Sequence, residues 1–215
     1  MCWNNSLSIK TFFITLIVVI VILINNNYSS EKKTRLQQYI SYFLLSIILM
    51  QLIEYFIWRN IENKLYNNIF SILGVLLLAS QPIMSLNLIE DPIKRNYLIK
   101  CYSIPAVINF IYNINTHHIH TTISKKKHLQ WNWQNTNIFY SSLTVLYYLF
   151  FLTIPFYFNG NYITLLFGGV SFISSLYLYK KDGSFGSIWC YFANVLTFYY
   201  AFIILIYLPF IKVKY

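Results

Sequence analysis

The sequence predicts an all-α integral membrane protein, a bundle of about seven transmembrane helices that form a single membrane domain. Of its 215 residues, 57% are hydrophobic and only 10% are charged, whereas soluble domains carry roughly 25% charged residues. Such a chain has too little polar surface to cover a water-soluble globule, which indicates lipid surroundings. The apolar runs lack the alternation of barrel strands, and lipid requires internally paired backbones, so the spanning segments are expected to be helices.

Seven apolar stretches define the expected spans, and six spans are the alternative. The first stretch is shorter than the roughly 20 residues that cross a bilayer unless its flanks contribute. Lys10 precedes it, and no small-residue cleavage site follows it, so we expect an uncleaved signal anchor rather than a signal peptide. The expected spans are 11–24, 39–58, 69–88, 97–114, 138–158, 162–179 and 188–210.

The net charge of +10 could indicate a nucleic-acid-binding protein. In a membrane protein, however, Lys and Arg gather in the loops, where they set topology and contact anionic lipid head groups. The run Lys125–Lys127 stands close to Trp131 and Trp133, a combination typical of head-group contact beside an interfacial aromatic anchor. We therefore expect the lipid bilayer and anionic head groups as partners, and no nucleic acid.

Polar and small residues recur at helical spacing inside four of the expected spans. Such residues mark the faces at which membrane helices meet, because lipid supplies little hydrophobic drive for association. The stripes serve either as packing contacts, worth about 0.6 kcal/mol per hydrogen bond, or as the lining of a cavity. Their members are Ser71, Gly74, Gln81 and Ser85; Asn109 and Asn113; Gly168, Ser171 and Ser175; and Ser187, Cys190, Asn194, Thr197 and Ala201.

Two prolines lie within expected spans. Pro82 and Pro105 each remove a backbone donor and free a carbonyl one turn earlier, near Leu78 and Cys101. Kinks of this kind build binding sites in some transporters, and elsewhere they only shape the bundle.

Glu54 is the carboxylate that stands inside an expected span. It lies four residues before Trp58, about 6 Å from the interface at 1.5 Å per residue, and its side chain leans deeper into the membrane. An intramembrane carboxylate is a candidate proton-relay or ion site. The alternative is a neutral, hydrogen-bonded Glu54 that ties its helix to polar residues of other helices. The expected binding residues are Glu54, Gln51, Gln81, Asn109 and Asn194.

The remaining polar residues offer little for catalysis. The segment around THHIH holds His117, His118, His120 and His128, but a zinc site needs three or four converging ligands, and no Asp, Glu or Cys lies nearby. Cys2, Cys101 and Cys190 are widely spaced, which indicates neither a disulfide framework nor a zinc ribbon. No hydrolase, kinase or nucleotide-binding motif is present. We therefore expect no metal, no cofactor and no catalytic residues.

Three segments, QLIEYFIW (51–58), HLQWNW (128–133) and GSFGSIWCYFAN (183–194), together resemble an uncharacterised family of small multi-pass membrane proteins. Members of this family are encoded by large DNA viruses and some microbial eukaryotes, so the resemblance implies a virion or host-cell membrane but no activity.

The first functional hypothesis is a small transporter or channel-like protein with a polar site around Glu54. It requires Glu54 to face the bundle interior. The alternatives are a structural or interaction protein of a viral or host membrane, and a lipid-modifying enzyme that uses the histidine segment.

Overall fold

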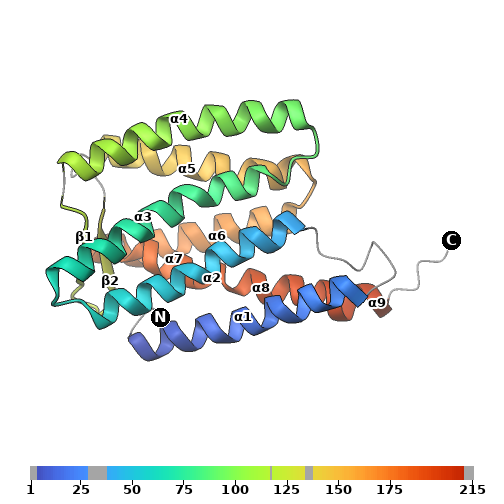
Figure 1. Cartoon of the computed structure of the whole chain (residues 1–215), viewed down its shortest axis with the longest axis horizontal. Coiled ribbons are helices and arrows are strands. Elements are labelled where there is room, and N and C mark those ends of the chain that lie inside the picture. The colour runs from blue at the N-terminus through green and yellow to red at the C-terminus, as the bar shows by residue number, and fades with distance from the viewer. Residues whose placement is uncertain (1–3, 29–37, 117, 134–137, 211–215) are drawn as a thin grey trace.

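The computed structural model describes residues 4–28, 38–116, 118–133 and 138–210. Figure 1 shows the long helices side by side, successive ones running in opposite directions, with a small β-hairpin at one end of the bundle. We call this the hairpin end and the opposite one the far end. The elements are α1 (Asn5–Tyr28), α2 (Gln38–Arg59), α3 (Lys64–Leu86), α4 (Pro92–Thr116), β1 (His120–Ile123), β2 (Leu129–Asn132), α5 (Ile138–Phe158), α6 (Tyr162–Tyr179), the 3₁₀ turn η2 (Lys180–Asp182), α7 (Phe185–Ala193), α8 (Val195–Ala201), the π-helix η3 (Phe202–Tyr207) and α9 (Leu208–Phe210).

Six helical segments of the described chain are long and apolar enough to cross a membrane, and the predicted helical membrane bundle is confirmed. The expected span 97–114 lies within α4, which is not among the six. Lys100, Asn109 and Asn113 lower the hydropathy of α4, although the helix runs alongside the others (Figure 1). The six segments are Asn5–Tyr28, Gln38–Arg59, Lys64–Leu86, Ser141–Phe158, Tyr162–Asp182 and Phe185–Tyr207.

The first helix is longer than the apolar stretch that predicts it. The expected span 11–24 covers only the middle of α1, because the polar flanks on both sides are also helical. At 1.5 Å per residue, the 24 residues of α1 extend about 36 Å, which is enough to cross a bilayer. α1 packs against α2 and α8 and buries Phe12, Val19 and Ile22, so it is part of the core.

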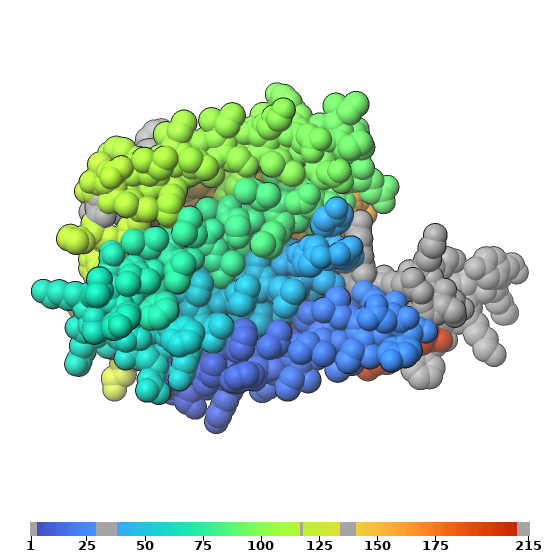
Figure 2. Space-filling model, viewed as in Figure 1, coloured from blue at the N-terminus to red at the C-terminus, as the bar shows by residue number. Residues whose placement is uncertain are grey.

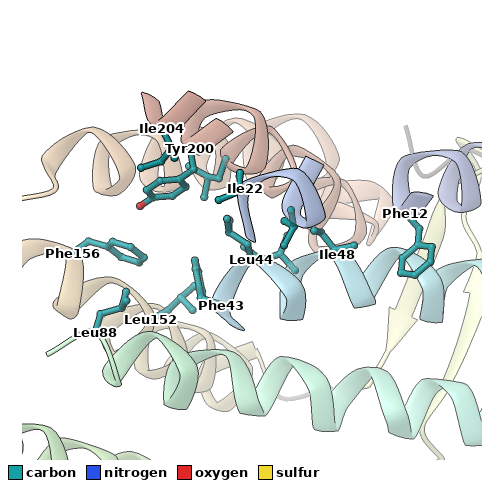
Figure 3. Packing of buried hydrophobic residues seen from close by; sticks show 13 residues of the cluster. Phe12, Ile22, Phe43, Leu44, Ile48, Leu88, Leu152, Phe156, Tyr200 and Ile204 are labelled. Carbon is teal, nitrogen blue, oxygen red and sulfur yellow. The ribbon is translucent and has the colours of Figure 1, made fainter. Parts of the chain in front are cut away.

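The largest apolar cluster joins α1, α2, α5 and α8 along the bundle (Figure 3). Leu44 and Ile48 of α2 are fully buried in it, and the rings of Phe43 and Phe156 meet at 5.5 Å. α2 is the most deeply enclosed of the spanning helices. Polar groups on its inner face are therefore shielded from lipid.

The two expected kink prolines lie inside α3 and α4. The carbonyl that Pro105 frees, that of Cys101, accepts a hydrogen bond of 2.6 Å from the Tyr147 hydroxyl of α5. The lost backbone bond of α4 is thus replaced by a bond to its neighbour, as expected for a freed carbonyl away from water.

The last span is not a continuous α-helix. The Asn194 side chain donates to the carbonyl of Cys190 at 2.8 Å, and the backbone is interrupted between α7 and α8 at this residue. Asn side chains compete with the backbone for such bonds, which disfavours regular helix. The π-helix η3 begins directly after α8. The expected span 188–210 therefore contains two departures from a regular α-helix.

The predicted polar stripes face the interior. Ser71, Gly74, Gln81 and Ser85 are all buried on α3, and Ser187, Cys190, Asn194 and Thr197 are buried along α7 and α8. On α4, Asn113 donates to the Asn109 side chain at 2.9 Å.

Candidate functional site

The segment between α4 and α5 contains the β-hairpin. β1 and β2 pair antiparallel, with Thr121 opposite Trp131. In the turn, the backbone N–H of Ser124 donates to the His128 carbonyl at 2.8 Å, and Lys127 adopts a left-handed φ of 61°. The hairpin closes one end of the bundle (Figure 1).

Asn67 of α3 holds this hairpin. Its side-chain N–H donates to the Thr121 carbonyl at 2.9 Å, and its side-chain oxygen accepts from the Thr121 N–H, also at 2.9 Å. The amide of Asn67 therefore pairs with β1 as a neighbouring strand would. The Thr121 hydroxyl lies 2.8 Å from the Ser71 hydroxyl and accepts from the Trp133 indole N–H at 2.9 Å. Asn67, Ser71 and Thr121 are buried, so these bonds are shielded from solvent.

Two glycines provide the space for the hairpin tryptophans. Trp131 and Trp133 stack, with ring centroids 4.3 Å apart. A Cβ atom at Gly74 of α3 would lie 2.6 Å from the Trp133 ring, and one at Gly186 of α7 would lie 2.9 Å from the Trp131 ring. Because Trp133 is only 4% exposed, it does not serve as the interfacial anchor that the sequence suggested. The glycines let it enter the bundle instead.

A cavity of about 460 Å³ lies between the hairpin, α3, α4, α5 and α7; we call it the main cavity. Its volume falls within the roughly 300–1,000 Å³ typical of small-molecule sites. No Asp, Glu, Lys, Arg or His is among the described residues that line it. Figure 2 shows a hollow between α4 and α3, in which atoms that lie deeper in the bundle are visible. The lining is largely aromatic and includes Tyr102, Phe110, Trp131, Trp133, Phe172 and Trp189.

A second cavity of about 50 Å³, the small cavity, lies nearer the far end. α5 runs away from the hairpin end; its Leu143 and Thr144 line the main cavity, whereas Leu152 and Phe156 line the small one. Trp189 and Cys190 of α7 line both cavities. The two spaces therefore follow one another along the bundle and are separated at these two residues.

We call Gln81, Tyr148, Trp189 and Cys190 the partition between the cavities. The Tyr148 hydroxyl of α5 donates to the Gln81 side-chain oxygen at 2.6 Å, and the Gln81 N–H donates to the Ser46 carbonyl of α2 at 3.3 Å. The Trp189 indole N–H donates to the Ser171 hydroxyl of α6 at 3.2 Å, and its ring meets that of Tyr148 edge-on. The partition and its hydrogen-bond partners thus connect five helices, α2, α3, α5, α6 and α7.

Glu54 and Gln51 are completely buried on α2, so Glu54 faces the interior, as the transporter hypothesis requires. Neither residue lines either cavity. Glu54 of α2 lies close enough to Cys190 for its charge to act on the thiol.

The five expected binding residues lie in different parts of the bundle. Gln51 and Glu54 are buried on α2 and line neither cavity, and Gln81 belongs to the partition. Asn109 lines the main cavity on α4. Asn194 is buried and caps the end of α7 through its bond to the Cys190 carbonyl. Of the five, Asn109 lines the main cavity and Gln81 lines the small one.

The histidines near the hairpin do not join the cavities. His118 and His120 are exposed, and His117 lies outside the described residues. His128 is 5% exposed and meets the Tyr179 ring edge-on at 5.3 Å. Burial lowers the pKa of His128, and the nearby Asp182 carboxylate acts in the opposite direction. The described residues include no group of three or more His, Cys, Asp or Glu placed to hold a metal ion.

Sequence reasoning missed the aromatic walls of the main cavity and the role of Tyr148. The available signal was the pairing of the small residues Gly74 and Gly186 on two helices with Trp131 and Trp133 on one short segment. Small residues on membrane helices mark close approaches, but the sequence does not show which bulky side chain occupies the space.

Comparisons of the chain with protein-family models, curated proteins and solved structures found no match.

Proposed function

We propose that this membrane protein is a small transporter in which a solute passes through the bundle by way of the main cavity, the partition and the small cavity. The observation that carries the proposal is the alignment of two cavities along the bundle with a shared wall at Trp189 and Cys190. Packing contacts between helices alone do not require two cavities aligned along the bundle.

The route continues in polar groups toward the far end. Thr164 lines the small cavity, and its hydroxyl lies 3.0 Å from the Tyr200 hydroxyl. That hydroxyl accepts from the Asn161 side chain at 3.0 Å, and Asn161 stands at the start of α6, at the far end. These groups offer successive hydrogen bonds to a solute that has left the partition.

In this proposal, the arrangement described is a closed state of the route. The small cavity, at about 50 Å³, has room for little more than one or two water molecules, whose share of liquid volume is about 30 Å³ each. Passage requires Trp189 to leave the partition. The break at Asn194 and the π-helix η3 follow directly on the same segment, and such irregularities are common where helices move or carry function.

In this proposal Glu54 supports the partition and does not touch the solute. It is buried beside Cys190 and outside both cavities. The alternative, proton or ion handling by Glu54, predicts instead that a Glu54→Gln variant loses solute flux.

The other two hypotheses have less support. A structural or interaction protein accounts for the hydrogen bonds between helices, such as that from Ser85 to the Leu152 carbonyl at 2.7 Å, but leaves the main cavity without a use. A lipid-modifying enzyme based on the histidines would need them to reach a substrate site, and no His lines the main cavity among the described residues.

We further propose that the hairpin end faces anionic lipid head groups. Exposed lysines gather there, at the hairpin turn and at the end of α6, and cationic residues next to a membrane attract anionic lipid. The identity of that membrane as viral or host-cell rests on the resemblance of three sequence segments. The lysines are Lys125, Lys126, Lys127, Lys180 and Lys181.

Solute uptake into proteoliposomes tests the transporter proposal. Ala106 lines the main cavity on α4, and Ala106→Trp fills it; the next residue, Val107, is 54% exposed on the outer face, so Val107→Trp is the matched control. The liposomes are exposed to a mixture of small uncharged amides and alcohols, and the solutes inside are quantified by mass spectrometry. We expect at least one solute to enter faster with the wild type and with Val107→Trp than with Ala106→Trp. Equal uptake by all three proteins would overturn the proposal.

A further inference from the structure

We infer that the main cavity takes an uncharged molecule with a flat apolar body and a head group, such as an amide or an alcohol, that both donates and accepts hydrogen bonds. This inference rests on the proposed function, because it assumes that the main cavity is the solute site. It names the chemical class of the solute.

The absence of charge follows from the wall. No Asp, Glu, Lys, Arg or His lines the main cavity among the described residues. A carboxylate or an ammonium group moved into such a space loses its hydration without gaining an ionic partner, which is strongly unfavourable. An uncharged head group avoids this cost.

Asn113 provides the acceptor. It is 4% exposed and lines the main cavity. Its side-chain N–H group is engaged by the carbonyl and the side-chain oxygen of Asn109, at 2.8 Å and 2.9 Å. The amide is therefore oriented, and its oxygen has no hydrogen-bond partner within the described part of the chain. Buried polar atoms in folded proteins are nearly always paired. Neighbouring protein atoms enclose this oxygen in the structure, so a donor on the solute pairs with it once the wall of the main cavity shifts to expose it.

Trp131 provides the donor. Its indole N–H is buried and has no acceptor among the residues that the structure describes, whereas that of its stacked neighbour Trp133 donates to Thr121. The Trp131 ring cannot easily turn away, because it is held between Trp133 and Gly186. Protein atoms enclose this N–H in the structure, so a carbonyl or hydroxyl oxygen of the solute accepts from it in the same shifted state of the wall.

The shape of the solute body follows from the aromatic lining. Tyr102 and Tyr147 stack on one side with ring centroids 5.7 Å apart, and their hydroxyls are engaged by the carbonyls of Ala79 and Cys101. They therefore present ring surface rather than free hydroxyls. Aromatic faces favour offset stacking with flat apolar rings.

Equilibrium dialysis with the protein in lipid nanodiscs tests the class with three matched probes. These are 2-naphthylacetamide, which is uncharged with donor and acceptor, 2-naphthylacetate, which is an anion, and 2-ethylnaphthalene, which has neither polar group. Binding to nanodiscs that carry Ala106→Trp is subtracted, which removes partition into lipid. We expect the amide to bind about tenfold more tightly than the carboxylate.

Trp131→Phe keeps an aromatic ring at this position and removes the indole N–H. It is expected to weaken amide binding about fivefold, the effect of one lost hydrogen bond, and to leave 2-ethylnaphthalene binding unchanged. The unchanged hydrocarbon binding shows that the variant is folded. Asn113→Leu removes the acceptor and is expected to have the same selective effect.

The outcomes separate this inference from the proposed function. If the carboxylate binds as tightly as the amide, or if Trp131→Phe and Asn113→Leu weaken the hydrocarbon as much as the amide, the inferred class is wrong, while the cavity remains a solute site. If no probe binds the wild type more than Ala106→Trp, the inferred class is overturned. The proposed function would still hold if proteoliposomes took up a solute of another class and Ala106→Trp blocked that uptake.

Discussion

Replacing Gly74 by alanine perturbs the contact between α3 and the hairpin directly. The added Cβ would lie 2.6 Å from one atom of the Trp133 ring and 3.2 Å from two others. Trp133 cannot retreat freely, because its indole N–H is bonded to Thr121 and the ring is buried. Overpacking of this kind costs about 1–3 kcal/mol, whereas a Gly→Ala change in a helix gains about 1 kcal/mol. The expected net loss of unfolding free energy is about 0–2 kcal/mol.

The control for this prediction is Gly168→Ala on α6. Nothing lies within 4 Å of a Cβ at Gly168, so this variant isolates the gain in helix propensity. Unfolding by sodium dodecyl sulfate in mixed micelles, followed by tryptophan fluorescence, gives both free energies. Gly74→Ala should be about 1–3 kcal/mol less stable than Gly168→Ala. Equal stability of the two variants would refute the argument that Gly74 is required by Trp133.

Three further predictions concern the supports of the site. Glu54→Gln is expected to leave solute uptake unchanged, because Glu54 lines neither cavity, and loss of uptake at wild-type stability would instead indicate a proton or ion site. Asn67→Ala leaves the buried N–H and carbonyl of Thr121 without their partner. Each such group costs about 1–3 kcal/mol, so the unfolding free energy should fall by about 2 kcal/mol or more. A fall below about 0.5 kcal/mol would contradict the geometry. The pKa of His128 is lowered by burial, so the unfolded chain binds more protons near the ordinary value of about 6.5. The unfolding free energy should therefore fall as the pH decreases below about 6.5, and His128→Phe should reduce this dependence; an unaltered pH profile in His128→Phe would argue against the assignment.

The helical bundle could be predicted because composition and the length of apolar runs act locally. The stripes on α3 and on α7 and α8 were also predictable, since helical spacing places Ser71, Gln81 and Ser85 on one face. The freed carbonyl of Cys101 was expected from Pro105 alone, and the structure adds only its partner, Tyr147.

The site could be predicted only in part, because it depends on contacts between distant segments. Glu54 drew attention as an acid in an apolar run, yet it lines neither cavity, and no acid is among the described residues that line the main cavity. The hairpin was missed because its strands are only four residues each and gain their stability from Asn67, more than fifty positions earlier in the chain. Trp133 was assigned to the lipid interface because the sequence does not reveal that Gly74 faces it.

The most direct test of the proposed route is the reactivity of Cys190, where the two cavities meet. In a protein with Cys2 and Cys101 replaced by serine, the rate of modification by benzyl methanethiosulfonate, a small uncharged reagent, is measured in proteoliposomes. If the main cavity leads to the partition, Cys190 reacts in the folded protein and in Val107→Trp, and about tenfold more slowly in Ala106→Trp. Modification also stops solute uptake until dithiothreitol reverses it. Equal rates in Ala106→Trp and Val107→Trp, or modification without effect on uptake, would contradict the proposed route.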